Sequence, residues 1–174
     1  DTLLEVYFDG QGYAQKDEIA QVRKYHKNPN MWDYFLRTRI AVDSLEDLLD
    51  EKEGNLDKVQ MLFADMEERE EAWKELEREG VFELVGSLQY NIEINAVGVN
   101  KGTGLVNLGK MLGIRREEIM ACGDGDNDIA MLKEVGFGVA MANAEEKVKA
   151  VADYITESNN DEGVAKAIEK FVLK

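Results

Sequence analysis

The chain is poor in the residues that cross-link proteins and in those that attract polyanions. Cys122 is its one cysteine, so no disulfide can form within the chain, and a reducing, cytoplasmic compartment is expected. Lysine and arginine number 21 against 36 aspartate and glutamate residues, and the net charge of −15 argues against a nucleic-acid partner or an anionic membrane. No apolar stretch approaches the roughly 20 residues that span a bilayer, and no signal peptide is visible.

Histidine is equally scarce. His26 is alone among Lys24, Tyr25 and Lys27, with no second ligand at a metal-binding spacing, and it is predicted to be a surface residue. Cys122 lies in an apolar run without a neighbouring histidine, which favours packing in a strand over chemistry. Neither residue therefore indicates a site.

Residues 119–132, IMACGDGDNDIAML, carry the strongest functional signal. The apolar run 119–122 predicts a buried strand, and Asp124, Asp126 and Asp128 follow before a helical pattern resumes. Two carboxylates about 6 Å apart repel by roughly 3 kcal/mol at an effective dielectric of about 20, so a cation between them would stabilise the turn. A strand end followed by a glycine turn and a helix is where open α/β sheets bind ligands. Oxygen ligands favour Mg²⁺ over a soft metal.

A second segment, residues 98–105 (GVNKGTGL), places Lys101 between glycines ahead of a predicted helix. A lysine at a helix start suits contact with a phosphate or a carboxylate. Its compact charge and three donors suit a group whose negative charge changes during a reaction. Lys101 is therefore a candidate catalytic and phosphate-binding residue.

Four sequence words together resemble the haloacid dehalogenase (HAD) superfamily of phosphohydrolases, most closely its Cof-type, subclass IIB sugar-phosphatase branch. The words are GVNKGTGL (98–105), GDGDNDIAML (123–132), GFGVAMANA (136–144) and ADYITESNNDEGVAKAI (152–168). The resemblance is strong over residues 98–174 and weaker over residues 1–97. It implies an α/β fold: the C-terminal part of a HAD-like Rossmannoid parallel sheet, with an α+β cap domain of the second type.

The resemblance also implies roles for individual residues. Lys101 would hold the nucleophile and the transferring phosphoryl group together. Asp124 would ligate Mg²⁺ directly, and Asn127 would contact the phosphate. Asp128 would support the metal from behind or through a water molecule, or support Lys101. Asp126 lies where the family varies and is predicted to be a turn or N-cap residue.

The family's aspartate nucleophile and acid/base aspartate, which share a DxDGT-like word, have no match, and neither has its Ser or Thr motif. The nearest candidate is Asp9, but Gln11 stands at the acid/base position and Tyr13 at the Thr position. This segment is more typical of a β-hairpin, with a turn at residues 10–12 joining strands 4–8 and 13–14. The chain is therefore expected to be a C-terminal fragment with a Mg²⁺ half-site and no attacking group, inactive alone.

The organisation of the chain changes near residue 97. Residues 1–97 are predicted to form the α+β cap, including a helix that Ser44 opens at Leu45. Residues 98–174 are predicted to form part of the catalytic core, with helices at 103–112, 127–134, 144–151 and 161–172 and strands at 119–122, 137–140 and 153–156. This alternation predicts parallel βαβ crossovers. Without the N-terminal strands, strand 119–122 would lose a neighbour and expose an apolar edge, so the isolated chain is expected to dimerise, swap, aggregate or bind a retained N-terminal piece.

Two classes of function remain open. The first is a Mg²⁺-dependent phosphatase of small phosphorylated metabolites, such as sugar phosphates, which forms an aspartyl-phosphate intermediate when the whole protein is present. The second is a catalytically dead metal-binding or regulatory fragment. A DxDGT-like word encoded upstream would distinguish them. Because the net charge repels a phosphate ester, Mg²⁺ and Lys101 would have to reverse the field locally.

Overall fold

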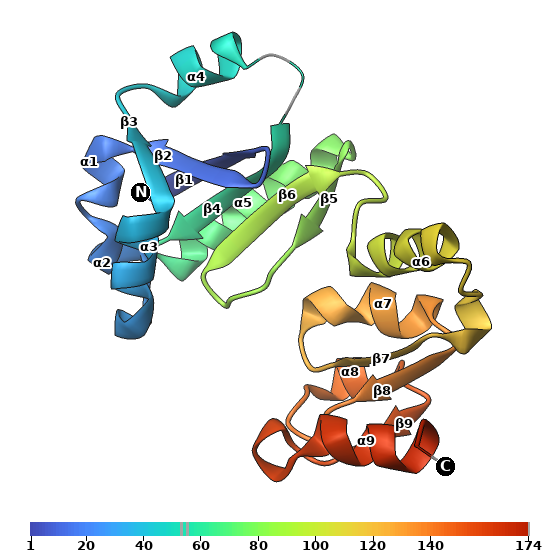
Figure 1. Ribbon diagram of the computed structural model, residues 1–174. Helices are drawn as coiled ribbons and strands as arrows, with labels where there is room; N and C mark the ends of the chain where they lie inside the picture. Colours follow the sequence, from blue (N-terminus) through green and yellow to red (C-terminus); the bar gives the residue numbers. More distant parts are fainter. Residues whose placement is uncertain (53, 55, 174) are drawn as a thin grey trace. The chain divides into compact units, whose positions relative to one another are not determined.

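The computed structural model of the protein describes residues 1–52, 54 and 56–173. The chain forms two compact units, Asp1–Val97 and Gly98–Lys174, which are coloured blue to green and yellow to red in Figure 1. Within the described residues, none of the helices combines the length and apolar character required to cross a bilayer.

The first unit is built on a six-stranded sheet in the order β3-β2-β1-β4-β6-β5. The strands are β1 Thr2–Phe8, β2 Gln11–Gln15, β3 Arg39–Val42, β4 Leu56–Phe63, β5 Phe82–Val85 and β6 Asn91–Ala96. Its helices are α1 Lys16–Ile19, α2 Val22–Tyr25, η1 Pro29–Met31, α3 Trp32–Thr38, α4 Leu45–Glu51 and α5 Met66–Glu79. All strand pairs are antiparallel except β2 with β3, so the unit has the α+β character predicted for residues 1–97.

Alternation along β1 supplies both faces of this sheet. Leu3 packs with Val22 and Phe35 beneath the early helices, whereas Val6 and Phe8 belong to a second cluster under α4. Successive side chains of a strand point to opposite faces, so one strand contributes to two hydrophobic cores.

The predicted hairpin is confirmed, but its turn is not where the sequence pattern placed it. β1 pairs with β2 in antiparallel register, with Phe8 opposite Gln11. The two-residue turn is Asp9-Gly10, with φ of 51° and 75°, whereas residues 11 and 12 lie within β2. Positive φ at both turn residues matches the twist of the flanking strands. Asp9 is therefore a hairpin-turn residue.

The predicted start of a helix at Leu45 is confirmed. α4 begins after Ser44, whose Oγ accepts a hydrogen bond from Asp47 N at 3.1 Å. Asp65 caps α5 at its start, and Gly80 ends it with φ of 65°. Both helices begin at a side chain that satisfies free backbone N–H groups.

The prediction that His26 is a surface residue is wrong. Its exposed fraction is 6%, and its Nδ1 is hydrogen-bonded to the Tyr90 hydroxyl at 2.9 Å. The His26 ring also contacts the rings of Phe35 and Tyr90 edge-on. Burial lowers the pKa of His26; the charge of Glu5 opposes this effect, and the charge of Arg39 adds to it. The neighbouring lysines suggested an exposed position, but the fold brings Tyr90, which is distant in the sequence, to the His26 ring.

The second unit is a parallel sheet in the order β7-β8-β9. The strands are β7 Met120–Gly123, β8 Phe137–Ala140 and β9 Tyr154–Ile155. The helices are α6 Lys101–Leu112, η2 Arg116–Glu118, η3 Asp126–Asp128, α7 Ile129–Glu134, α8 Glu146–Lys149, η4 Asn159–Asp161 and α9 Gly163–Phe171. The predicted parallel βαβ crossovers are confirmed, although tight 3₁₀ turns replace the first residues of two predicted helices.

Close packing of α7 on the sheet sets the position of the loop before it. Leu132 of α7 is buried with Ala140 of β8 and Val148 of α8. A Cβ at Gly138 would lie 2.4 Å from the Leu132 carbonyl oxygen, so the helix approaches β8 as closely as a glycine allows. The start of α7 is therefore held firmly beside the end of β7.

Candidate functional site

The candidate site lies at the carboxyl edge of the parallel sheet in the second unit. Gly123 and Ala140, the last residues of β7 and β8, are register partners. The loops that follow these strands and β9 carry Asp124, Asn143 and Asn159 respectively. Because the carboxyl ends of parallel strands share one edge, the fold brings these loops together at the usual ligand position of open α/β sheets.

The carboxylate of Asp128 organises the turn after β7. Its Oδ2 accepts hydrogen bonds from the backbone N–H groups of Asp124 at 2.9 Å and Gly125 at 3.0 Å. The residue is 5% exposed. A Cβ at Gly123 would lie 2.5 Å from the Asp128 Cβ, so the carboxylate reaches the turn only because position 123 has no side chain. The turn is thus built around a buried negative charge.

Lys101 meets the same carboxylate from the start of α6. Its Nζ lies 2.5 Å from Asp128 Oδ1, and half of the Lys101 side chain remains exposed. Asn100 caps α6 by accepting from Gly102 N at 2.9 Å and Thr103 N at 3.0 Å. The cap starts the helix at Lys101 and so places the ammonium group at the edge of the sheet.

Electrostatics keep Asp128 ionised in spite of its burial. Burial by itself raises the pKa of Asp128, but hydrogen bonds from Lys101 and from the N–H groups of Gly125 and Asp124 outweigh it and lower the pKa below its usual value. Hydrogen bonds to the charged form of a carboxylate stabilise that form. Lys101 and Asp128 therefore form a charged pair at neutral pH.

Asp124 is exposed and is held from the next loop. Asn143 donates from Nδ2 to Asp124 Oδ2 at 2.9 Å, and Asn143 Oδ1 accepts from Asn159 N at 2.9 Å. Sequence reasoning assigned no role to Asn143, although it lies in the GFGVAMANA word. Its position just after the predicted strand 137–140 could have indicated a role at the site, because the carboxyl ends of parallel strands lie at a common edge of the sheet.

Asp126 lies in the η3 turn, as one of the two predictions for it stated. The N-cap prediction was wrong: Gly125 precedes η3 and Asp128 precedes α7. The Asp126 carboxylate pairs with Lys147 Nζ at 2.5 Å, and both side chains are about half exposed. Such a surface pair contributes little to stability, and Lys147 carried no signal in the sequence.

Asn127 is the central residue of η3 and is partly buried. Its Oδ1 lies 2.8 Å from the place that a Gly125 Cβ would occupy, so the side chain folds back over the turn. The structure thus places Lys101, Asp124, Asn127 and Asp128 at one sheet edge. Among these four residues, only Lys101 and Asp128 are bonded to each other through their side chains.

The residues of this edge match one part of a magnesium site. Within residues 1–52, 54 and 56–173, no three histidine, cysteine, aspartate or glutamate side chains are grouped to hold a metal ion. Mg²⁺ in phosphate-handling enzymes nevertheless often takes only one or two carboxylates, with water and substrate oxygens completing its shell. The exposed carboxylate of Asp124 suits that requirement. Both oxygens of Asp128 are already engaged, so it fits a supporting position.

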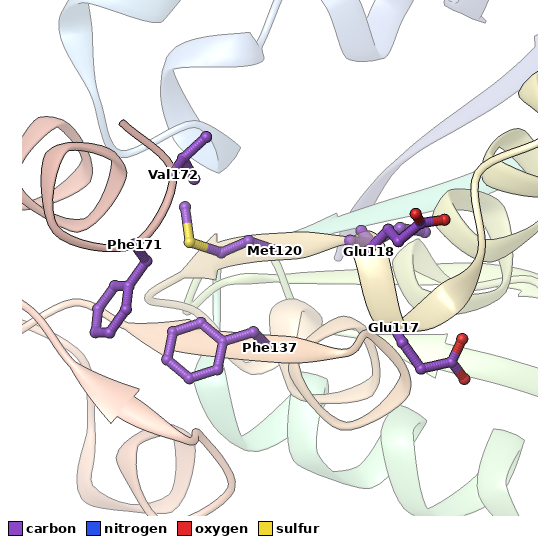
Figure 2. Close-up of a pocket in the computed structure, with 7 residues that line it drawn as sticks. Glu117, Glu118, Met120, Phe137, Phe171 and Val172 are labelled. Carbon is purple, nitrogen blue, oxygen red and sulfur yellow. The ribbon is translucent and has the colours of Figure 1, made fainter. Parts of the chain in front are cut away.

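A cavity of about 450 Å³ lies at the other end of the same strands. Figure 2 shows Met120 and Phe137, the first residues of β7 and β8, beside Phe171 and Val172 of the C-terminal segment. Ligands of parallel α/β sheets bind at the carboxyl ends of the strands. This cavity is at the amino ends of the strands and is lined by Glu117 and Glu118 as well as by apolar side chains, and its position makes it separate from the candidate site.

Comparison with known sequences identifies related proteins. The pattern of haloacid dehalogenase-like hydrolases matches residues 4–168. The chain is 50% identical over 105 residues to 5-amino-6-(5-phospho-D-ribitylamino)uracil phosphatase YcsE of Bacillus subtilis (strain 168), covering 60% of this chain and 42% of that protein. It is 45% identical over 87 residues to a phosphoglycolate phosphatase of Methanosarcina mazei, covering 50% and 38%. The matches thus span less than half of these relatives.

Solved structures share the fold. A haloacid dehalogenase-like hydrolase from B. subtilis aligns with a TM-score of 0.79 and 28% identity, covering 98% of this chain and 65% of that one. The HAD subclass IIB sugar phosphatase BT4131 aligns with a TM-score of 0.73 and 24% identity, covering 99% and 62%. The fold is therefore the predicted α/β arrangement of a HAD-like parallel sheet with an α+β cap.

Proposed function

Because this chain belongs to the haloacid dehalogenase-like hydrolase family, we propose that the whole protein is a Mg²⁺-dependent phosphatase of small phosphate esters. The observation that carries the proposal is the Lys101–Asp128 ion pair, at 2.5 Å, beside the exposed Asp124 at the carboxyl edge of a parallel sheet. A fixed cation next to an exposed carboxylate suits a ligand that brings both a phosphoryl group and a divalent metal.

Each residue of this edge has a distinct part in the proposal. Lys101 keeps donors for a phosphoryl oxygen after its bond to Asp128, because an ammonium group has three and half of the side chain is exposed. The ionised Asp128 holds the ammonium group of Lys101 in place and orders the turn. Asn127 donates its amide to the phosphate. Asp124 holds Mg²⁺, which when bound neutralises charge on the transferring phosphoryl group.

The proposed substrate is a small-molecule phosphate ester resembling a sugar phosphate. The relatives named above are phosphatases of small phosphorylated compounds, which supports this class. A net charge of −15 disfavours a nucleic-acid chain, whose affinity depends on basic residues that release counterions. A small ester needs only the local positive charge of Lys101 and Mg²⁺.

The proposal assigns the attacking group to a residue outside these 174 residues. In an aspartyl-phosphate mechanism a carboxylate attacks phosphorus as the alcohol leaves, and water then hydrolyses the acyl phosphate. Asp9, the nearest match by sequence, lies in a β-hairpin turn, where Gly10 N donates to Asp57 Oδ2 at 2.9 Å. The 174-residue chain alone is therefore expected to be inactive. The alternative is a catalytically dead metal-binding or regulatory fragment.

Hydrolysis of a generic aryl phosphate with and without Mg²⁺ tests this proposal. The whole protein should turn over the ester only with Mg²⁺, and Lys101→Ala or Asp124→Ala should abolish turnover. The 174-residue chain should show no turnover. Asp126→Asn is the matched control, because it removes a neighbouring carboxylate that pairs with Lys147 instead. A whole protein that never hydrolyses phosphate esters would support the catalytically dead alternative.

We also propose that the 174-residue chain associates through the edge of β7. In the described sheet β7 pairs with β8 alone, so one row of its backbone groups has no strand partner. Apolar side chains of α6 in the same unit, Leu108, Met111 and Leu112, are exposed. Sedimentation should reveal a dimer or larger species at micromolar concentration, and a purely monomeric chain would contradict this proposal.

A further inference from the structure

Asn143 connects the Asp124 carboxylate to two separate loops of the sheet edge. Its Nδ2 donates to Asp124 Oδ2 at 2.9 Å, and its Oδ1 accepts from the backbone N–H of Asn159 at 2.9 Å. Asn143 lies between β8 and α8, and Asn159 begins η4 after β9. The three residues thus follow three consecutive strands of the parallel sheet.

The second of these bonds sets the orientation of the Asn143 amide. A backbone N–H can only donate, so the group facing Asn159 must be the amide oxygen. The NH₂ group is then left to face Asp124, and the contact with its carboxylate is a donor-to-acceptor bond. The two partners together leave only one sensible orientation of the amide.

The loop that carries Asn143 is itself tied on both sides. Met141 N donates to the Gly123 carbonyl at 3.0 Å, and Ala142 N donates to the Glu157 carbonyl at 3.3 Å. These bonds join the loop to the end of β7 and to the segment after β9. Asn143 therefore holds Asp124 from a fixed base rather than from a free loop.

We propose that Asn143 is a positioning residue that presents Asp124 to Mg²⁺. The bond occupies Oδ2, whereas Oδ1 has no hydrogen-bond partner among the described side chains and backbone groups. An exposed aspartate otherwise samples several rotamers, and holding it reduces the entropy lost when it binds a metal. The inference rests on the proposed magnesium site and adds a residue to it that touches neither metal nor substrate.

NMR of the 174-residue chain tests this role without measuring turnover. Mg²⁺ is titrated while the amide signals of Asp124 and Gly125 are followed in the wild type, Asn143→Ala and Asn160→Ala. Partners that orient metal ligands change affinity by about 10- to 100-fold. Because Asp124 is exposed, we expect about a tenfold weaker Mg²⁺ affinity in Asn143→Ala. Asn160→Ala, in the same loop as Asn159, should match the wild type.

A metal-free measurement tests the contact itself. The side-chain NH₂ protons of Asn143 should exchange with water more slowly in the wild type than in Asp124→Ala, which removes only their acceptor. This arm gives a result even if Asn143→Ala fails to fold. Equal exchange in the two proteins would overturn the inference.

The outcomes separate this inference from the proposed function. Equal Mg²⁺ affinity of the wild type and Asn143→Ala overturns the positioning role and leaves the magnesium site standing. A wild type whose Asp124 and Gly125 signals do not respond to Mg²⁺ contradicts the magnesium site, and the positioning role falls with it. Both the magnesium site and the positioning role are supported if Asn143→Ala binds Mg²⁺ more weakly than the wild type and Asn160→Ala does not, and if the Asn143 NH₂ protons exchange more slowly in the wild type than in Asp124→Ala.

Discussion

Substitutions of Asp128 should separate its two tasks, ordering the turn and pairing with Lys101. Asp128→Ala removes the acceptor of two backbone N–H groups and the partner of a half-exposed ammonium. Allowing about 1 kcal/mol for each of the two backbone bonds and for the screened ion pair, the loss of stability is about 3 kcal/mol. Asp128→Asn keeps an oxygen for the N–H groups and loses only the ion pair, at about 1 kcal/mol.

Backbone hydrogen exchange is the suitable assay. Trp32 and Trp73 both lie in the first unit, so tryptophan fluorescence would not report on unfolding of the second. The amides of Leu132 and Val139, in buried positions of α7 and β8, report directly on it. A loss of about 3 kcal/mol should speed their exchange by roughly 150-fold in Asp128→Ala, and one of about 1 kcal/mol by roughly fivefold in Asp128→Asn.

The comparison between the two variants shows whether the backbone hydrogen bonds or the ion pair of Asp128 stabilise the second unit. If Asp128→Asn accelerates exchange as much as Asp128→Ala, the ion pair carries the stability, and the hydrogen bonds of Asp128 to the turn contribute none of it. If neither variant accelerates exchange, the buried carboxylate does not hold the turn at all. Asp126→Asn provides the control: its exposed pair with Lys147 should contribute about 0.5 kcal/mol or less.

Three further predictions follow from burial and close approach. The pKa of Asp128 is lowered in the folded state, so its contribution to stability should be present above its ordinary pKa and be lost as pH falls through the folded value, as measured by acid denaturation followed by exchange. The pKa of His26 is also lowered. For a base, this means that its full contribution to the free energy of unfolding is present above about pH 6.5 and decreases as pH falls below that value. Urea unfolding of the first unit should therefore give a smaller free energy of unfolding at pH 5.5 than at pH 7.5, and His26→Gln should remove this difference. Gly123→Ala should destabilise the second unit by about 2 kcal/mol, because the new Cβ would lie 2.5 Å from the Asp128 Cβ, whereas Gly104→Ala in α6, which meets nothing within 4 Å, should stabilise it by about 0.5–1 kcal/mol in the same exchange assay.

Local pattern was sufficient wherever a feature depends on neighbours in the chain. The strand at β8 occupies the predicted residues 137–140, and α4 begins after the predicted cap Ser44. Apolar runs of four residues and a capping side chain act within one turn or one strand, so a linear reading captures them. The sequence also indicated a helix beside Lys101, but it placed the start at residue 103, whereas α6 begins at Lys101 after the cap Asn100.

Pairing between segments decided what local pattern left open. The hairpin turn moved to Asp9-Gly10 because the register of β1 with β2 determines which residues remain unpaired. His26 became a core residue because Tyr90, 64 positions along the chain, meets its ring. Neither outcome has a signature in the adjacent residues.

In the candidate site, too, some features follow from the local sequence and others only from the tertiary structure. The sequence by itself determined which residue types stand at the carboxyl edge, because a strand, a glycine turn and a helix follow one another within residues 119–132. Only the tertiary structure decided which side chains touch: Asn143 reaches Asp124 across 19 positions, and Asn159 reaches Asn143 across 16. Those separations are bridged because parallel strands in register bring the loops after them to one edge, and that register is a property of the packed sheet.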